Sequence, residues 1–347
     1  MLMARQLMRT PLNLAVVALA LAAALAVPAI RHWREQPPPP PRPPEPLQST
    51  WSPPDSVNAG SGGDYPFGLA LAPNGRKLVY PAAQSGRITL WLEDLRTGET
   101  HALTGTDGAA APFWSADGSR IGYFSADRLK AIDPSRGQIS DLADVRSGRG
   151  GAWNSAGDIV FAPQADSGLM RRAPDGSITP FTTIDRAKGE IAHAWPAFVT
   201  DGAHVLFLVT ASDASRAGVW IASLADPAAR RRIAAADSQV IVSGETMFYL
   251  KDLALMAQPI DLTTFAASGQ PRVAALRVGR GALGQIFATA APDALIYGAP
   301  SAMLRQLQRV TREGAPAGWS SEPIDAWDLR IAPVSYTHLR AHETLRY

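Results

Sequence analysis

The hexapeptide Gly279–Gly284 has the spacing of a phosphate-binding loop, G-x-G-x-x-G. In a dinucleotide site this loop follows a strand, opens a helix and precedes an acidic residue by about 20 positions. Here the next residues, 285–288, lead into a further turn instead of a helix, and a related Gly148-Arg149-Gly150 segment opens the third repeat. We therefore interpret both segments as loops between repeated units and predict no cofactor.

Histidine and arginine offer little other chemistry. The chain has no cysteine, which excludes thiol catalysis, disulfides and cysteine-ligated metals. Neighbouring arginines in 171–172 and 230–232 are interpreted as exposed strand or hairpin edges. His193, two residues before Trp195, could face the mouth of a ring, but a packed histidine is the favoured interpretation. Four histidines are scattered and do not predict a metal site; they are His32, His101, His193 and His204.

No motif indicates an enzyme. The chain lacks the Gly-x-Ser-x-Gly elbow of hydrolases and the Val-Ala-Ile-Lys, His-Arg-Asp and Asp-Phe-Gly patterns of protein kinases. The net charge is +2, from 33 basic and 31 acidic residues, which gives no field that favours nucleic acid. We predict a non-enzymatic chain with no catalytic or metal-binding residues and leave its ligand-binding residues unassigned.

A unit of about 43 residues repeats along the chain, and each copy begins at a small turn. Taking Gly75, Gly118, Gly157, Gly202, Gly244 and Ala294 as anchors, the successive steps are 43, 39, 45, 42 and 50 residues. Periods in this range are typical of β-propellers, in which each repeat forms one blade of four short strands. The sequence thus predicts an all-β propeller with six blades covered and a seventh interrupted.

Each anchor precedes a run of β-branched and aromatic residues, such as 78–80, 121–124 and 205–208, which predicts a buried strand. Aromatic residues also stand just before the anchors. We expect these rings to fill the space between adjacent blades; they are Phe67, Phe113, Trp114, Trp153, Trp195, Phe198, Phe287 and Trp327.

The segments 71–80, 113–123 and 94–99 resemble TolB-type, WD40-like propeller repeats. Segments such as 149–153 and 255–261 are more similar to the extracytoplasmic propeller of bacterial membrane-bound serine/threonine kinases. In that family a membrane helix and a proline-rich stretch precede the blades, but the kinase domain comes before the helix. Only 11 residues precede the predicted membrane helix in this chain. Either the blades therefore stand alone, or the sequence continues upstream.

Two terminal regions are not expected to belong to the propeller. The apolar run 12–30 has the length of a bilayer span, although a cleaved signal peptide ending near 27–29 is the alternative. The segment 31–64 contains five consecutive prolines from Pro37 to Pro41 and predicts a stiff polyproline II spacer. At the other end, 334–344 matches one translated frame of a common transposon adapter used in sequencing libraries. We interpret 334–347 as a non-native tail and ignore the i, i+4 pair His338 and His342.

These observations divide the chain into a short leader (1–11), a membrane helix (12–30), a linker (31–64), an incomplete propeller (65–333) and the tail (334–347). The resemblance implies a single-pass protein of the cytoplasmic membrane. Its propeller would lie in the periplasm or outside the cell and bind a protein or small-molecule ligand, as a sensor and possible part of a receptor kinase. The alternatives are a TolB-like envelope scaffold and the propeller of a truncated prolyl-oligopeptidase-type peptidase.

Overall fold

The computed structural model describes residues 68–298, apart from 282, 283 and 293, together with short strands between 304 and 325. Nine residues between 15 and 27 are also described, and they are helical. The chain separates into two compact units, Met1–Ser52 and Pro53–Tyr347. Among the described residues, no helix combines the length and apolar character that a bilayer span requires. The predicted linker 31–64 and tail 334–347 lie outside the described residues.

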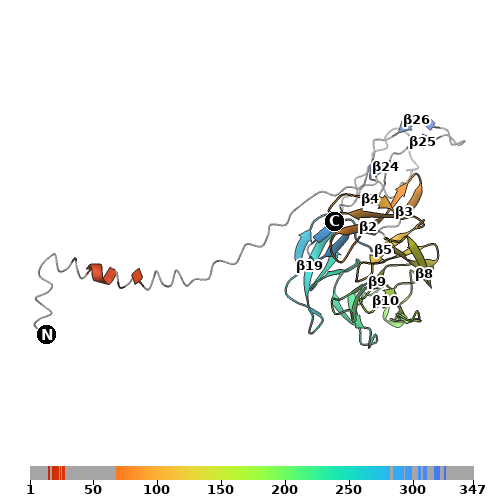
Figure 1. The fold of residues 1–347 in the computed structure, drawn as a ribbon. Helices are drawn as coiled ribbons and strands as arrows, with labels where there is room; N and C mark the ends of the chain where they lie inside the picture. Colours follow the sequence, from red (N-terminus) through yellow and green to blue (C-terminus); the bar gives the residue numbers. More distant parts are fainter. Residues whose placement is uncertain are drawn as a thin grey trace, which may run out of the picture. The chain divides into compact units, whose positions relative to one another are not determined.

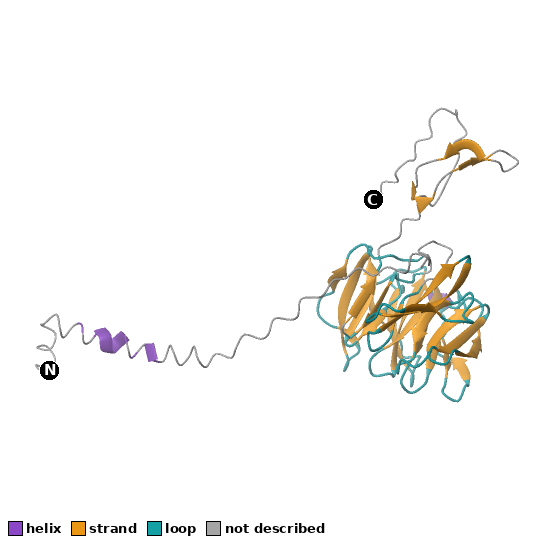
Figure 2. Ribbon diagram, turned by 45° about the horizontal axis from the view of Figure 1, so that its top comes forward, coloured by secondary structure: helices purple, strands orange, loops and turns teal. Residues whose placement is uncertain are grey.

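The described residues of the second unit form strands joined by short loops (Figures 1 and 2). Four successive antiparallel sheets have four strands each, in sequence order. The first contains β1 (Ala70–Leu71), β2 (Lys77–Gln84), β3 (Arg87–Asp94) and β4 (Thr100–Ala102), and the second β5 (Ala110–Trp114), β6 (Ile121–Ser125), β7 (Arg128–Asp133) and β8 (Gln138–Asp144). The third contains β9 (Gly151–Trp153), β10 (Ile159–Phe161), β11 (Met170–Arg172) and β12 (Ile178–Pro180), and the fourth β13 (Glu190–Phe198), β14 (His204–Ala211), β15 (Gly218–Ser223) and β16 (Arg231–Ala234).

A fifth sheet and a hairpin follow. The fifth sheet contains β17 (Ile241–Ser243), β18 (Thr246–Lys251), β19 (Ala254–Asp261), β20 (Ala266–Ala267) and β21 (Arg272–Ala275), and the hairpin β22 (Ala288–Ala291) and β23 (Ala294–Tyr297). The remaining elements are a 3₁₀ turn, η1 (Arg186–Lys188), and the strand pairs β24 (Leu304–Arg305) with β27 (Ile324–Asp325) and β25 (Gln308–Val310) with β26 (Pro316–Ser320). The all-β propeller is therefore confirmed with five blades, and a count of six complete blades stays a prediction.

The repeat pattern predicted the second strand of each blade correctly. The apolar runs after the anchor turns form β2, β6, β10, β14 and β18, and the side chains of β6 and β10 are buried throughout. Adjacent blades share apolar clusters: one joins Val79 and Leu90 of the first blade to Ile121 of the second. The run 294–297 forms β23, but its side chains are only half-buried or exposed, in contrast to the expected buried strand.

The first strand of every blade faces the common axis. β22 contacts both β17 and β1, and β1 in turn contacts β5. The Leu71 backbone N–H donates to the Thr289 hydroxyl at 2.9 Å, although 218 residues separate the two. Among the described residues, six inner strands therefore surround the channel. The interrupted seventh blade lies outside the described residues and stays a prediction.

Thr289→Val is expected to lower the free energy of unfolding by about 1–3 kcal/mol. The methyl group preserves the shape of the side chain but leaves the buried Leu71 N–H without an acceptor. Urea denaturation of both proteins would measure the loss. Thr104→Val, at an exposed threonine, is the matched control, and equal stability of the two variants would show that this hydrogen bond does not hold the ring closed.

Candidate functional site: the central channel

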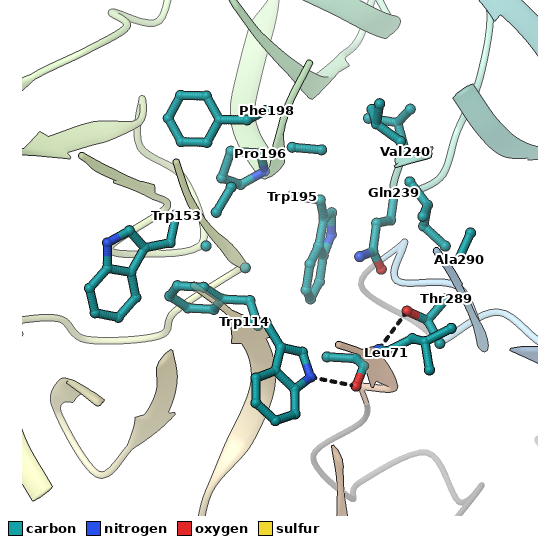
Figure 3. A pocket seen from close by; sticks show the side chains of 18 of the residues that line it. Leu71, Trp114, Trp153, Trp195, Pro196, Phe198, Gln239, Val240, Thr289 and Ala290 are labelled. Atoms are coloured by element: carbon teal, nitrogen blue, oxygen red, sulfur yellow. Dashed lines mark hydrogen bonds between the residues drawn. The ribbon is translucent and has the colours of Figure 1, made fainter. Parts of the chain in front are cut away.

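The channel along the axis contains a cavity of about 490 Å³ (Figure 3). Each of the six inner strands, or the loop leading into it, contributes to the lining. The cavity extends from the loops that enter the inner strands, at Gly68 and Gln285, to the anchor turns, at Pro73 and Ala116. A volume of this size is in the range of small-molecule sites.

Five of the lining residues carry large aromatic side chains. Phe113 and Trp114 of β5, Trp153 of β9, and Trp195 and Phe198 of β13 all contribute to it. Phe113, Trp114 and Trp195 also belong to apolar clusters between blades, as the sequence predicted. The indole N–H of Trp114 donates to the carbonyl of Ala70 at 2.9 Å, which fixes this ring across two blades.

Among the described residues that line the cavity, none carries an ionisable side chain. The polar lining side chains are Asn154, Ser155, Thr200, Gln239, Gln285 and Thr289. Such a surface can bind by stacking and by neutral hydrogen bonds, but it offers no group for acid–base chemistry.

Several polar groups of the lining already have partners. The Asn154 amide accepts from the Asp158 N–H at 2.8 Å and donates to the Gly202 carbonyl at 2.8 Å, which ties the third blade to the fourth. The Thr200 hydroxyl donates to the Gly244 carbonyl at 2.7 Å and ties the fourth to the fifth. These bonds hold the turn end of the channel in shape.

The residues that the sequence singled out lie mostly outside the channel. The G-x-G-x-x-G segment falls in the loop between β21 and β22, where Arg280 and Ile286 form an isolated antiparallel β-bridge. No helix follows it among the described residues. Arg149 and Gly150 lie in the loop between β8 and β9. The interpretation of both segments as loops between blades is confirmed.

The histidines do not gather. His101 is exposed on β4, and His204 pairs with Asp201 and stacks on the Phe265 ring at 3.7 Å. Within the described part of the chain, no three acidic or histidine residues are grouped as a metal would need. His32, His338 and His342 lie outside the described residues.

A buried charge cluster lies between the third and fourth blades and was not foreseen. The Glu190 carboxylate is fully buried and accepts from Arg216 at 2.6 Å, from Arg230 at 2.7 Å and from the Asp185 backbone N–H at 2.9 Å. Both guanidinium groups also lie over the Trp220 ring, at 4.6 and 5.2 Å. Burial alone would raise the pKa of Glu190, but the bonds from Arg230, Asp185 and Arg216 lower it to about 2.

His193 completes this cluster. Its Nδ1 lies 2.8 Å from the Thr182 hydroxyl, and its Nε2 lies 3.2 Å from both the Glu190 carboxylate and Arg230. Burial and the nearby Arg230 lower its pKa to about 4. The expected packed histidine is therefore found, and it does not line the channel, whereas its neighbour Trp195 does.

The arginine runs are only partly exposed. Arg231 and Arg232 are exposed as expected, but the side chain of Arg230 keeps only 13% of its surface and pairs with Glu190. Arg171 pairs with the buried Asp158 at 2.8 Å. Arg172 donates to the Leu142 carbonyl of the preceding blade at 3.2 Å. The expectation of exposed edges is wrong for these three residues, because each guanidinium finds a partner at or near a blade boundary.

No protein-family model matches the chain, and a search of curated proteins found no match. Solved structures that are similar include TolB from Acinetobacter baumannii, at 18% identity over 59% of this chain with a TM-score of 0.45. A putative TolB from Agrobacterium tumefaciens has 15% identity, covers 60% of this chain and 79% of its own, and gives a TM-score of 0.46. The chain spans 55% of the length of the Acinetobacter protein.

Enzymes occur among these structures as well. An oligogalacturonate lyase in complex with manganese has 18% identity over 64% of this chain and 67% of its own, with a TM-score of 0.43. The similar solved structures thus include both TolB proteins and an enzyme.

Proposed function

We propose that this propeller is a non-catalytic binding module whose ligand or partner occupies the central channel. The observation that carries the proposal is the aromatic cavity, whose described lining has no ionisable side chain. Apolar pockets with a few placed polar groups are the usual form of a binding site. The blades around it act as a rigid support, so that specificity depends on side chains of the inner strands and their loops.

The proposal extends to the place of the module in the cell. The apolar run 12–30 would anchor the chain in the cytoplasmic membrane, and the proline-rich segment 31–64 would hold the propeller at a distance on its extracytoplasmic side. The resemblance to kinase-linked propellers supports a sensor that passes a binding event to a kinase. The sequence alternatives, an envelope scaffold and a peptidase propeller, would use the same channel. Fusion of alkaline phosphatase after residue 347 would be active only if the propeller lies outside the cytoplasm.

A ligand screen would test the binding function directly. Purified full-length protein would be mixed with each member of a library of uncharged metabolites. Its Tm would be measured by differential scanning fluorimetry. A ligand at about 100 times its Kd stabilises the folded state by about 2.7 kcal/mol, which raises the Tm by several degrees in a domain of this size.

The double variant Trp153→Ala, Phe198→Ala removes two rings from the cavity lining and is expected to lose this Tm shift. The exposed variant Val273→Ala is expected to keep it. A shift of equal size in the double variant would place binding elsewhere, and the absence of any shift across the library would contradict a small-molecule ligand in the channel.

A further inference from the structure

One backbone feature recurs where the inner strands enter the channel. The residue seven positions before the anchor glycine has a positive φ in the first four blades: 146° at Gly68, 44° at Ala111, 85° at Gly150 and 53° at Trp195. The register of β5 against β6 and of β13 against β14 shifts around Ala111 and Trp195, which marks a bulge at each. All four residues line the cavity.

Trp195 has a large side chain, whereas the residues at this position in the first three blades are small. A positive φ is ordinary for glycine but costs a bulky residue about 1–3 kcal/mol. Glycine serves the same position in two other blades and alanine in one. The backbone geometry alone therefore favours a small residue, so the indole must be explained by what it contacts.

The indole of Trp195 lies between the third blade and the loop that leads to β22. A Cβ added at Gly150 would lie 2.6 Å from Cε3 of the ring, so the ring packs directly on the third blade. On the other side, a Cβ at Gly284 would lie 3.9 Å from the indole Nε1. In Figure 3 the ring stands between the side chains of Trp153 and Gln239. Trp195 itself keeps only 6% of its surface.

An unpartnered polar atom occurs at the same end of the cavity. The Gln285 side chain lines the cavity, is 6% exposed, and its Oε1 has no hydrogen-bond partner among the described residues. Nearby, Gln239 uses its Oε1 to accept from the Ile286 N–H at 3.2 Å. A buried amide oxygen without a donor costs about 1–3 kcal/mol, and a ligand N–H or O–H would recover that cost.

We propose that Trp195 closes one end of the channel and that the resulting aromatic pocket binds an uncharged, flat-ringed small molecule with a hydrogen-bond donor. The ligand ring lies against the part of the Trp195 indole that faces the cavity, and its donor bonds to the Oε1 atom of the Gln285 amide. Charged analogues are rejected, because the described lining has no counter-charge to offset their desolvation. This assignment rests on the proposed binding function and adds the ligand class and the residue that selects it.

Two probes that share one ring and differ by a charged carboxylate group test the proposal. Indole has a flat ring and one N–H donor, and indole-5-carboxylate adds a negative charge to the same ring. Binding of each to the full-length protein would be measured by saturation-transfer difference NMR titration. Indole is expected to bind at least 10-fold more tightly than indole-5-carboxylate.

The variants separate the role of Trp195 from binding in general. Trp195→Gly is expected to weaken indole binding at least 10-fold, while Trp195→Phe, which keeps a flat ring, stays within about 3-fold of wild type. Trp195→Gly should keep the far-ultraviolet circular dichroism of wild type, because glycine is the residue at the equivalent positions 68 and 150. Leu276→Ala, at a leucine with 68% exposure outside the cavity, is the control for binding to surface apolar groups.

Two results would overturn the proposal, and they have different meanings. If Trp195→Gly binds indole as wild type does while Trp153→Ala loses it, the channel binds ligands but Trp195 does not select them. If neither probe binds the wild type, or both bind equally, the proposed ligand class is wrong, and the fluorimetry screen then decides whether the channel binds another kind of ligand.

Discussion

Replacing Glu190 with alanine is expected to lower the free energy of unfolding by about 3–5 kcal/mol. The carboxylate is fully buried and neutralises two guanidinium groups, those of Arg216 and Arg230. The variant would leave both cations next to apolar surface without a counter-charge, and removing one partner of a buried pair is more costly than removing the whole pair. The Asp185 N–H would also lose its acceptor.

The loss should be visible in chemical denaturation, as a lower midpoint with an unchanged slope. Glu190→Gln retains the shape and one acceptor oxygen, so it should lose less than the alanine variant. Glu245→Ala, at an exposed turn, is expected to change stability by less than 0.5 kcal/mol. A loss below 1 kcal/mol in Glu190→Ala would mean that water solvates both arginines and that the cluster does not hold the blades together.

The local parts of the fold were predictable from the sequence. Gly75, Gly118, Gly157 and Gly202 all have positive φ, between 68° and 93°, and only glycine takes up that conformation without cost. Each stands directly before a short apolar run, so the turn and the following strand are encoded within a dozen residues. A repeat of such units predicts the propeller without any long-range information.

Long-range pairing was not predictable in the same way. Glu190 lies 26 residues from Arg216 and 40 from Arg230 in the sequence, and nothing in either segment specifies that they meet. Arg230 therefore looked like its exposed neighbours in 231–232. Glu190 and His193, three residues apart in a strand of otherwise apolar residues, were the available signal that polar groups are buried there.

The channel was only partly foreseen, for a related reason. The sequence places Trp153 and Trp195 correctly before the anchor turns, but period alone does not say whether a ring points between blades or toward the axis. The bulge at Trp195 decides the direction in which this side chain points, because an extra residue in a strand moves the following side chains to the opposite face. The ring closure through Thr289 likewise depends on a contact across 218 residues, which the repeat pattern does not contain.

Stability is also expected to fall as the pH decreases from about 6.5 to 4, because His193 is buried in its neutral form. The pKa of His193 is lowered to about 4 from the ordinary 6.5. Between these values the unfolded chain binds a proton that the folded protein does not, so acidification favours unfolding. The difference corresponds to roughly 3 kcal/mol over this window. Glu190, with its pKa lowered to about 2 from 4.5, adds a second loss of stability below pH 4.5.

The contributions of His193 and Glu190 to the loss of stability can be separated, because they act in different pH ranges. His193→Gln keeps a polar side chain near Thr182 and Glu190 but cannot titrate, so its stability should be nearly independent of pH between 6.5 and 4.5. It should still fall below pH 4.5, where Glu190 binds a proton in the unfolded chain but stays ionised in the folded protein. His101→Gln, at an exposed histidine, should follow the wild-type curve. Free energies from urea denaturation at half-unit pH steps would show this, and a wild-type slope in His193→Gln would place the titrating group elsewhere.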